Sequence, residues 1–323
     1  MIGIPMIHPI KNWISIGAIL LISGFASAAY GQSKELKWKL KAGDQFAVVL
    51  VQKSNSETKV DTRETTVASE TTIGMDWEVK NVNSNGDATI SQSLTSVKLS
   101  VTGFTRKKKG ETASPLMEVN FDTSAPDGIT SESKNLMQQV QPLLGLNFEV
   151  VMSPQGEIID VQTPENVAKQ LAQMPDTQKL RALFSKDGLK DILGASAIVV
   201  PKNLTPGQSW TEKTETTTAL GSFNRNRTYT YIETKPVDGK QVAEFSLNVT
   251  LDPIDESDSQ AAATALDSKL IEFTGSGVLL MDVDGGFFHS SKIENRAHSE
   301  KPYREKMVDT VVTNQIEMTV NRK

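Results

Sequence analysis

Apolar and polar side chains alternate with a period of two residues through much of this chain, and such a pattern fits few folds. Val97, Leu99 and Val101 are apolar while the residues between them are polar, and the stretch 245–251 repeats the arrangement. Successive side chains of a β-strand point to opposite faces, so each stretch predicts a strand with one buried face. We expect further strands at 46–51, 72–79, 228–232, 278–283 and 316–320.

Short turn signals separate several of these predicted strands. They are Asn85-Gly86-Asp87, Pro154-Gln155-Gly156, Asp238-Gly239-Lys240 and Asp284-Gly285-Gly286. Glycine after asparagine or aspartate favours a tight hairpin turn, because the turn needs a positive φ that glycine accepts. Strands joined by hairpins run antiparallel, so the sequence predicts an antiparallel meander.

Helical periodicity is concentrated in the middle of the chain. A first helix is predicted from Ser131 to Gly145, a second starts at Thr163 and Pro164, and a third runs from Asp176 to Gly194. All three are amphipathic, so each needs an apolar surface to cover. We therefore expect a mainly β (α+β) fold, with a long curved antiparallel sheet or open barrel and about three helices on its concave face.

The first thirty or so residues have the composition of a secretory signal peptide. Lys11 is the only charged residue, a short apolar run follows from Trp13 to Phe25, and small residues come next. We expect cleavage after Ala28 or Gly31 and export to the periplasm or beyond. The alternative is an uncleaved anchor, although the apolar run is short for a membrane span.

The remaining residues, 32–323, are expected to form a single β-rich exported domain. Its flanks, 32–130 and 201–323, share the positions of turn and aromatic residues around a helical block at 131–195. This similarity suggests two related halves. The alternative is that any two meanders share such turn chemistry.

Composition narrows the classes of partner. The chain of 323 residues has a net charge of −5, only 6% aromatic residues and no cysteine. A negative charge argues against nucleic acid as a partner, and few aromatic rings argue against a stacking surface for bases or sugars. Without cysteine there is no lipid attachment at the cleavage site. No transmembrane span is expected once the signal is removed, because no later segment is long and apolar enough.

The sequence contains no recognisable catalytic or metal-binding motif. Beyond the leader there are two histidines, His289 and His298, and Ser290 and Ser291 adjoin the first of them. On a regular strand only Ser291 would share a face with His289, and two solvent-facing polar residues explain the pair better. The two histidines are not spaced as in zinc enzymes. We therefore expect a protein that is not an enzyme, with no catalytic residues, no metal site and no cofactor.

The segment that includes Asp282, Asp284 and Gly285 resembles part of a calcium-binding loop. It does not match the full pattern, because the glycine comes too early and Glu294 is the thirteenth residue, not the twelfth. A β-turn between two strands is the better interpretation.

Three segments carry a resemblance to a known family. They are 148–161, with its strand, tight turn and strand; Pro201 with Pro206-Gly207-Gln208-Ser209-Trp210; and the hairpin 277–286. Together they resemble a family of exported bacterial proteins with a domain of unknown function. The resemblance implies no catalytic residues. The succession of sheet, helices and sheet is also similar to the periplasmic lipoprotein-carrier superfamily, in which helices cover the concave face of a curved sheet.

Two functions remain open from the sequence. The first is a non-catalytic envelope protein that binds or carries an apolar or amphiphilic ligand, or a lipidated protein, between the sheet and the helices. The second is a structural or protein-interaction component of the envelope, for which Thr-rich strands such as 211–218 would supply a surface. The expected partners are therefore a lipid, an amphiphile or an envelope protein, and no ligand-binding residue is identified.

Overall fold

The computed structural model describes residues 35–323 with the exception of 108–109, 126–130, 163–197, 219–220, 255–268 and 304. Residues 35–323 form one compact unit. The predicted signal peptide, with its cleavage positions Ala28 and Gly31, lies outside the described residues, and so do the second and third predicted helices. In the described part of the chain, no helix has the length and apolar character needed to cross a membrane.

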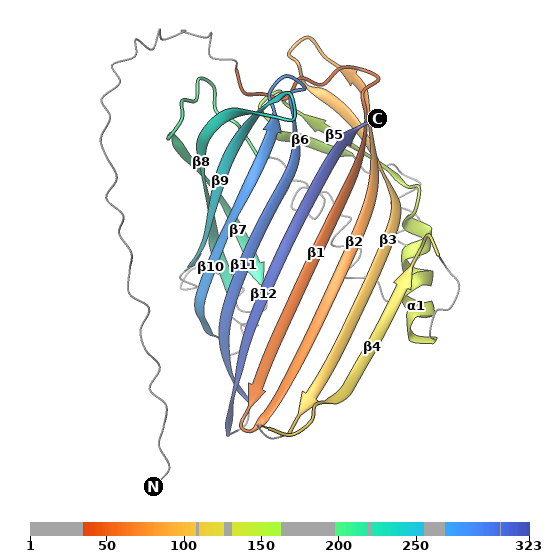
Figure 1. The fold of residues 1–323 in the computed structure, drawn as a ribbon, viewed down its shortest axis with the longest axis vertical. Helices are drawn as coiled ribbons and strands as arrows, with labels where there is room; N and C mark the ends of the chain where they lie inside the picture. Colours follow the sequence, from red (N-terminus) through yellow and green to blue (C-terminus); the bar gives the residue numbers. More distant parts are fainter. Residues whose placement is uncertain are drawn as a thin grey trace, which may run out of the picture. The chain divides into compact units, whose positions relative to one another are not determined.

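A single 12-stranded antiparallel sheet dominates the described residues (Figure 1). Its order is β6-β5-β3-β2-β1-β12-β11-β10-β9-β8-β7, and β4 also pairs with β3. The strands are β1 (Gln45–Val60), β2 (Arg63–Val82), β3 (Ala88–Arg106), β4 (Ser114–Asp122), β5 (Asn147–Met152), β6 (Ile158–Gln162), β7 (Ser209–Thr218), β8 (Gly221–Val237), β9 (Lys240–Pro253), β10 (Lys269–Asp282), β11 (Phe287–Tyr303) and β12 (Lys306–Arg322).

The predicted hairpin turns are confirmed, since each joins two neighbouring strands of the sheet. At the β8–β9 turn, Asp238 has φ 48° and Gly239 has φ 78°. Two consecutive positive φ values are the requirement of the two-residue hairpin turn that the Asp-Gly sequence predicts. The local turn chemistry therefore sets the order of strands within each half of the sheet.

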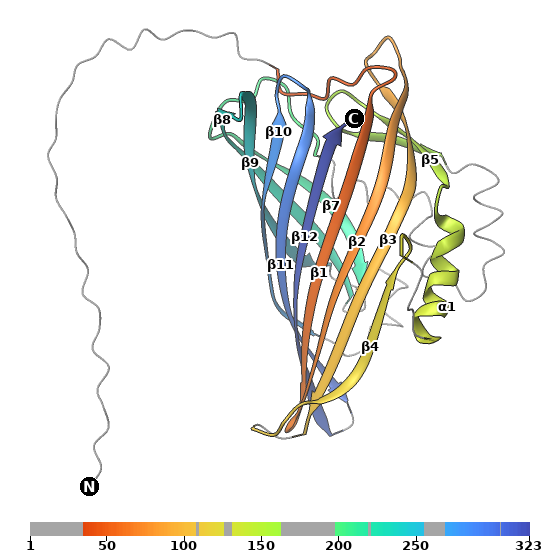
Figure 2. The ribbon, with the colours of Figure 1, turned by 45° about the vertical axis from the view of Figure 1, so that its right-hand side comes forward.

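The two flanks of the chain meet where the first strand pairs with the last. β1 and β12 are hydrogen-bonded from Phe46 opposite Arg322 to Val60 opposite Val308. This ladder makes the sheet continuous from β6 through to β7. In Figures 1 and 2 the β7–β8 end lies behind β11 and β12, so the sheet curves and turns one face inward.

The inward face carries the hydrophobic core. The even-numbered residues Phe46 and Val48 of β1 are buried there, together with Phe245 of β9 and Phe288 of β11. The segment before β1 closes this region, because Trp38 donates its backbone N–H to the carbonyl of Pro154 at 2.7 Å. Its indole ring lies 5.7 Å from the ring of Phe288. Aromatic rings from distant strands thus fill the space inside the curve.

The prediction of about three helices on the concave face is wrong. The described residues contain one α-helix, α1 (Ser131–Val140), followed by a single 3-10 turn, η1 (Gln141–Leu143). α1 lies beside the edge strand β4 (Figure 1), where the backbone N–H of Asn120 donates to Oγ of Ser133 at 3.2 Å. Leu143 packs in a second core cluster against β3 and β5. The apolar spacing predicts one helix from Ser131 to Gly145, but Pro142 tightens the backbone and Gly145 turns it back to the sheet.

Glu212 is a half-buried carboxyl at the margin of the core. Its Oε1 accepts the backbone N–H of Val199 at 3.0 Å, and the hydroxyl of Tyr229 lies 3.5 Å from Oε2. Burial raises the pKa of Glu212 above its usual value, although the Val199 bond and the charge of Arg227 oppose that shift. Folding therefore favours the protonated carboxyl.

We expect this carboxyl to make the protein less stable as pH rises. The folded state holds the proton more tightly than the unfolded chain, so the stability present below the unfolded pKa of 4.5 is lost as pH passes through the raised folded pKa. Glu212→Gln keeps an acceptor for Val199 and cannot ionise. Urea unfolding at several pH values should show the variant gaining on the wild type between acid and neutral pH. A constant difference across that range would contradict this assignment.

Candidate functional site

A groove of about 820 Å³ lies on the face of the sheet opposite the core. Because Phe46 and Val48 face the core, the odd-numbered residues of β1 face the other way, among them Lys53 and Asn55. Both of these side chains line the groove. The site is therefore an open, solvent-facing surface and not a space between the sheet and helices.

Two rows of side chains, aligned by cross-strand register, make up most of the lining of the groove. In an antiparallel sheet, directly paired residues point to the same face and lie side by side. The first row crosses seven strands through Ser100, Glu70, Lys53, Gln315, Glu294, Ser276 and Asn248. The second row lies two residues further along the strands and consists of Thr102, Ala68, Asn55, Thr313, Arg296 and Thr274.

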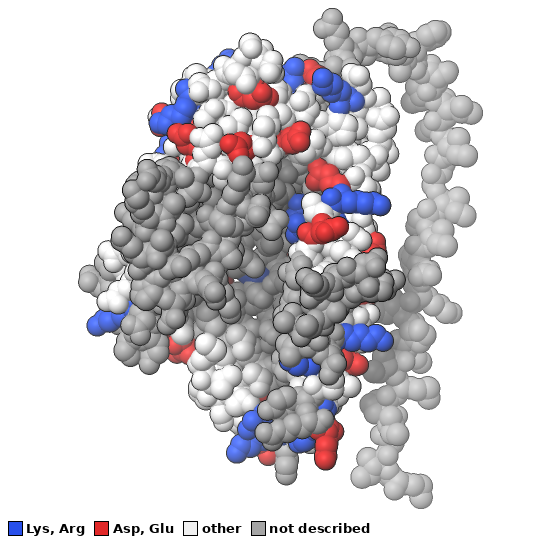
Figure 3. All heavy atoms as spheres, turned by 180° about the vertical axis from the view of Figure 1, so that it is seen from behind, with Lys and Arg blue, Asp and Glu red and all other residues white. Residues whose placement is uncertain are grey.

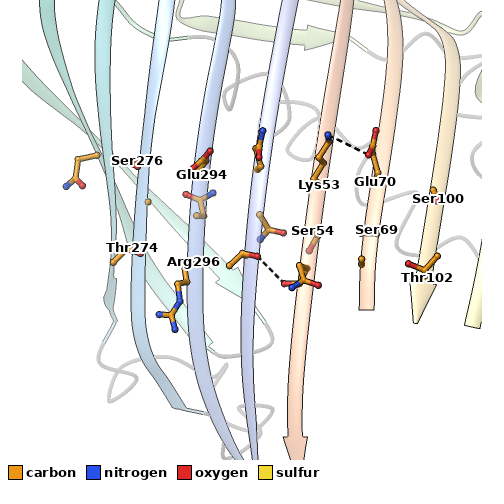
Figure 4. Close-up of a pocket in the computed structure, with 18 residues that line it drawn as sticks. Lys53, Ser54, Ser69, Glu70, Ser100, Thr102, Thr274, Ser276, Glu294 and Arg296 are labelled. Atoms are coloured by element: carbon orange, nitrogen blue, oxygen red, sulfur yellow. Dashed lines mark hydrogen bonds and ion pairs between the residues drawn. The ribbon is translucent and has the colours of Figure 1, made fainter. Parts of the chain in front are cut away.

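The lining is polar and its charges are paired. Figure 4 shows Lys53 of β1 beside Glu70 of β2, with 3.7 Å between Nζ and Oε2. Lys292 lies 3.2 Å from Glu294 at the margin of the groove. Apart from these charged groups, hydroxyls and side-chain amides make up most of the surface. Such a surface can exchange many hydrogen bonds and offers no net charge to attract an ion.

The opposite side of the molecule has no dominant charge either. In Figure 3 the described lysines and arginines are interspersed with aspartates and glutamates instead of gathering into a patch of one sign. A field of mixed sign does not steer a highly charged partner.

The histidine and serine pair considered from the sequence does not form a site in the described residues. Ser291 is 6% exposed and lies on the core side, opposite Leu279 and Met318. A register shift next to His289 breaks the alternation that would place the two side chains together. Burial lowers the pKa of His289, and among the described residues no hydrogen bond joins it to either serine.

The interpretation of Asp282–Gly285 as a turn is confirmed. Residues 283–286 form the turn between β10 and β11, and the backbone N–H of Gly285 donates to Oδ1 of Asp282 at 2.6 Å. Oδ2 of Asp282 lies 3.3 Å from Nζ of Lys240. The carboxylate thus serves the turn and an ion pair, which explains its burial without calcium.

The Thr-rich strand considered as an interaction surface is β7, at the end of the sheet. Its hydroxyls pair across to β8, with 2.7 Å between Oγ of Ser209 and Oγ1 of Thr230, and 2.9 Å between Oγ1 of Thr211 and Oγ1 of Thr228. The groove rows themselves were missed from the sequence. Polar residues at alternate positions predict only a solvent-facing side, and nothing local shows which strands will align.

The described residues form one large, curved antiparallel sheet, and comparison with known proteins adds a family match over part of the chain. Residues 94–242 match the model of a family of unknown function (DUF6263). This match confirms the resemblance to a domain of unknown function. The likeness to lipoprotein carriers stays a prediction. Among curated proteins, none matches this chain.

Three solved structures are similar at low identity. The first, on lipid–protein interactions in lipovitellin, has 12% identity and a TM-score of 0.45 over 88% of this chain, which spans only 25% of that chain. An outer membrane channel from Pseudomonas putida F1 has 10% identity and a TM-score of 0.21, covering 90% of this chain and 98% of that one. A beta-barrel-like protein of a domain of unknown function (DUF1849) from Brucella abortus has 8% identity and a TM-score of 0.18, covering 88% and 100%. TM-scores this low do not support any inference about function.

Proposed function

We propose that the protein is a non-catalytic, exported binding protein that holds a polypeptide segment of an envelope partner in the polar groove. This proposal rests on the chemistry of the side chains that line the groove. Its hydroxyl and amide side chains are arranged in two continuous rows, and they match the hydrogen-bonding groups of a polypeptide.

Other ligand classes fit the groove less well. An acyl chain would leave the lining Asn and Ser groups without hydrogen-bond partners, at a cost of about 1–3 kcal/mol for each group buried. Nucleic acid would need an excess of cations, whereas Lys53 and Lys292 are already paired with glutamates. Bases or sugars would gain from aromatic stacking, and none of the described residues that line the groove is aromatic.

The experiment is site-specific photo-cross-linking in the cells that produce the protein. We place a photoreactive residue at Ser100 or Ser276, at the two ends of the first row, and at Lys80, an exposed position of β2 outside the lining. A discrete protein adduct is expected from the two groove positions and not from Lys80. N-terminal sequencing of the recovered protein should begin at Ala29 or Gln32, as export requires.

A variant in which a large side chain fills the groove serves as the matched control. Thr313→Trp adds a large side chain to the exposed middle of the second row, and it should remove the adduct formed at Ser276 without loss of folded protein. Equal labelling at Lys80, or labelling that survives Thr313→Trp, would contradict the proposal.

An apolar or amphiphilic ligand is a separate proposal that concerns the core face. Solvent extraction of the purified protein distinguishes the two ideas. Lipid recovered from the protein, with no protein adduct in cells, would favour the carrier over the polypeptide-binding groove.

A further inference from the structure

Beyond the groove, the same face of the sheet carries a row of charged side chains near the β11–β12 turn. In cross-strand order the row is Arg106, Glu64, Lys59, Asp309, Glu300 and Lys269. The charges alternate in sign except at one place, where Asp309 of β12 and Glu300 of β11 are directly paired. Like charges directly opposite each other destabilise a sheet. The pair therefore needs a compensating positive charge.

His298 adds a third donor to this pair. It lies two residues before Glu300 on β11 and so shares its face. The ligand atoms of His298, Glu300 and Asp309 all lie within 4.8 Å of one another. Nε2 of His298 is buried and has no hydrogen-bond partner among the described residues. The three side chains thus converge on one small volume.

The distance between His298 and Asp309 fits a shared metal ion better than a direct hydrogen bond. Nε2 of His298 lies 3.4 Å from Oδ2 of Asp309. A hydrogen bond between these atoms would be about 2.7–3.0 Å long. Two ligands bound at about 2.0–2.1 Å to a tetrahedral zinc ion stand about 3.3 Å apart. The side chain of Asp309 is 42% exposed, so the cluster borders solvent, although Nε2 of His298 itself is buried.

Two lysines flank the carboxylate pair, Lys59 opposite Asp309 and Lys269 opposite Glu300, but within the described residues neither forms a salt bridge with it. Lys59, opposite Asp309, lies 3.8 Å from Glu64, and Arg296 is bonded to Glu272, the residue opposite His298. Among the described residues, no lysine or arginine forms a salt bridge with Glu300. The two carboxylates therefore retain the capacity to bind a cation.

We propose that His298, Glu300 and Asp309 form a binding site for a divalent transition metal, with zinc as the best fit. One imidazole and two carboxylates leave room for a water molecule in the fourth tetrahedral position. The imidazole ligand favours zinc over magnesium or calcium, which prefer oxygen donors. Because the ligands come from two paired strands, the ion would join β11 to β12 near their turn.

The test is isothermal titration of zinc into the full-length protein, purified without a polyhistidine tag, at about pH 7.5. We expect one zinc ion per chain bound at this site, and a higher melting temperature in its presence, because the ion binds only the folded arrangement. His298→Gln and Asp309→Asn should each weaken zinc binding by about tenfold or more and remove the rise in melting temperature.

His289→Gln is the matched control, since it removes the other described histidine, which lies outside the cluster. Its zinc affinity should equal that of the wild type. Absence of zinc uptake by the wild type would overturn the proposal, and so would unchanged affinity in folded His298→Gln. Loss of affinity in His289→Gln alone would place the site elsewhere and would also overturn it.

Discussion

Gly156→Ala should destabilise the protein by about 3 kcal/mol, because the turn between β5 and β6 has no room for a side chain. Gly156 has φ 95°, a conformation that L-residues with a Cβ rarely adopt. A Cβ there would overlap the carbonyl oxygen of Ile198 and lie 2.7 Å from Nε1 of Trp38. A backbone carbonyl cannot rotate aside as a side chain could. Urea unfolding followed by tryptophan fluorescence measures the loss.

Gly43→Ala separates backbone strain from the steric overlap. Gly43 has φ 89°, close to that of Gly156, but no atom lies within 4 Å of the position its Cβ would take. We expect a loss of only about 1 kcal/mol, from the positive φ alone. If the two variants lost the same stability, the added Cβ of Gly156→Ala would not clash with Trp38 and Ile198 as predicted.

Phe245→Ala should cost about 3–5 kcal/mol, because Phe245 lies at the centre of the aromatic core. The side chain is 0% exposed, and its ring lies 5.5 Å from Tyr231, 5.7 Å from Phe288 and 6.0 Å from Trp210. Its removal leaves a cavity bordered by three strands, since Tyr231 is on β8, Phe288 on β11 and Trp210 on β7. The measurement is again equilibrium unfolding in urea.

Phe104→Ala is the matched control for this loss. Phe104 is 45% exposed on β3, so the same substitution should cost less than about 1 kcal/mol. Should Phe245→Ala fail to fold, Phe245→Leu, expected to cost about 1–2 kcal/mol, measures the same site. Similar losses for Phe104→Ala and Phe245→Leu would contradict a central role for Phe245.

The strands and turns could be predicted from the sequence because their signals are local. Phe245, Leu247 and Val249 alternate with polar residues and are buried on one face of β9. Asp238-Gly239 specifies a hairpin through the conformations that its two residues accept. The helical prediction failed because its signal is also only local. Spacing shows that residues near Val140 and Leu143 have an apolar side, but not that the chain leaves the helix at Pro142 to pack on β3 and β5.

The candidate sites could not be predicted, since they depend on register between strands. Lys53 meets Gln315 only because β1 pairs with β12, and the two residues are far apart in the sequence. His298 and Glu300 are close in sequence, but their proximity to Asp309 depends on which residues of β12 they oppose. Polar residues at alternate positions predict a solvent-facing side and leave open how those residues line up across the sheet.

The sequence alone therefore determined where many of the strands lie, where the predicted hairpins turn and which side chains along those strands share a face. Period-two alternation and turn conformation are properties of a few consecutive residues. Only the tertiary structure decided that β1 and β12 join the two flanks, that polar rows form a groove opposite the core, and that His298 lies beside Asp309. These features arise from long-range strand pairing, whose register is set by the packing of the whole sheet.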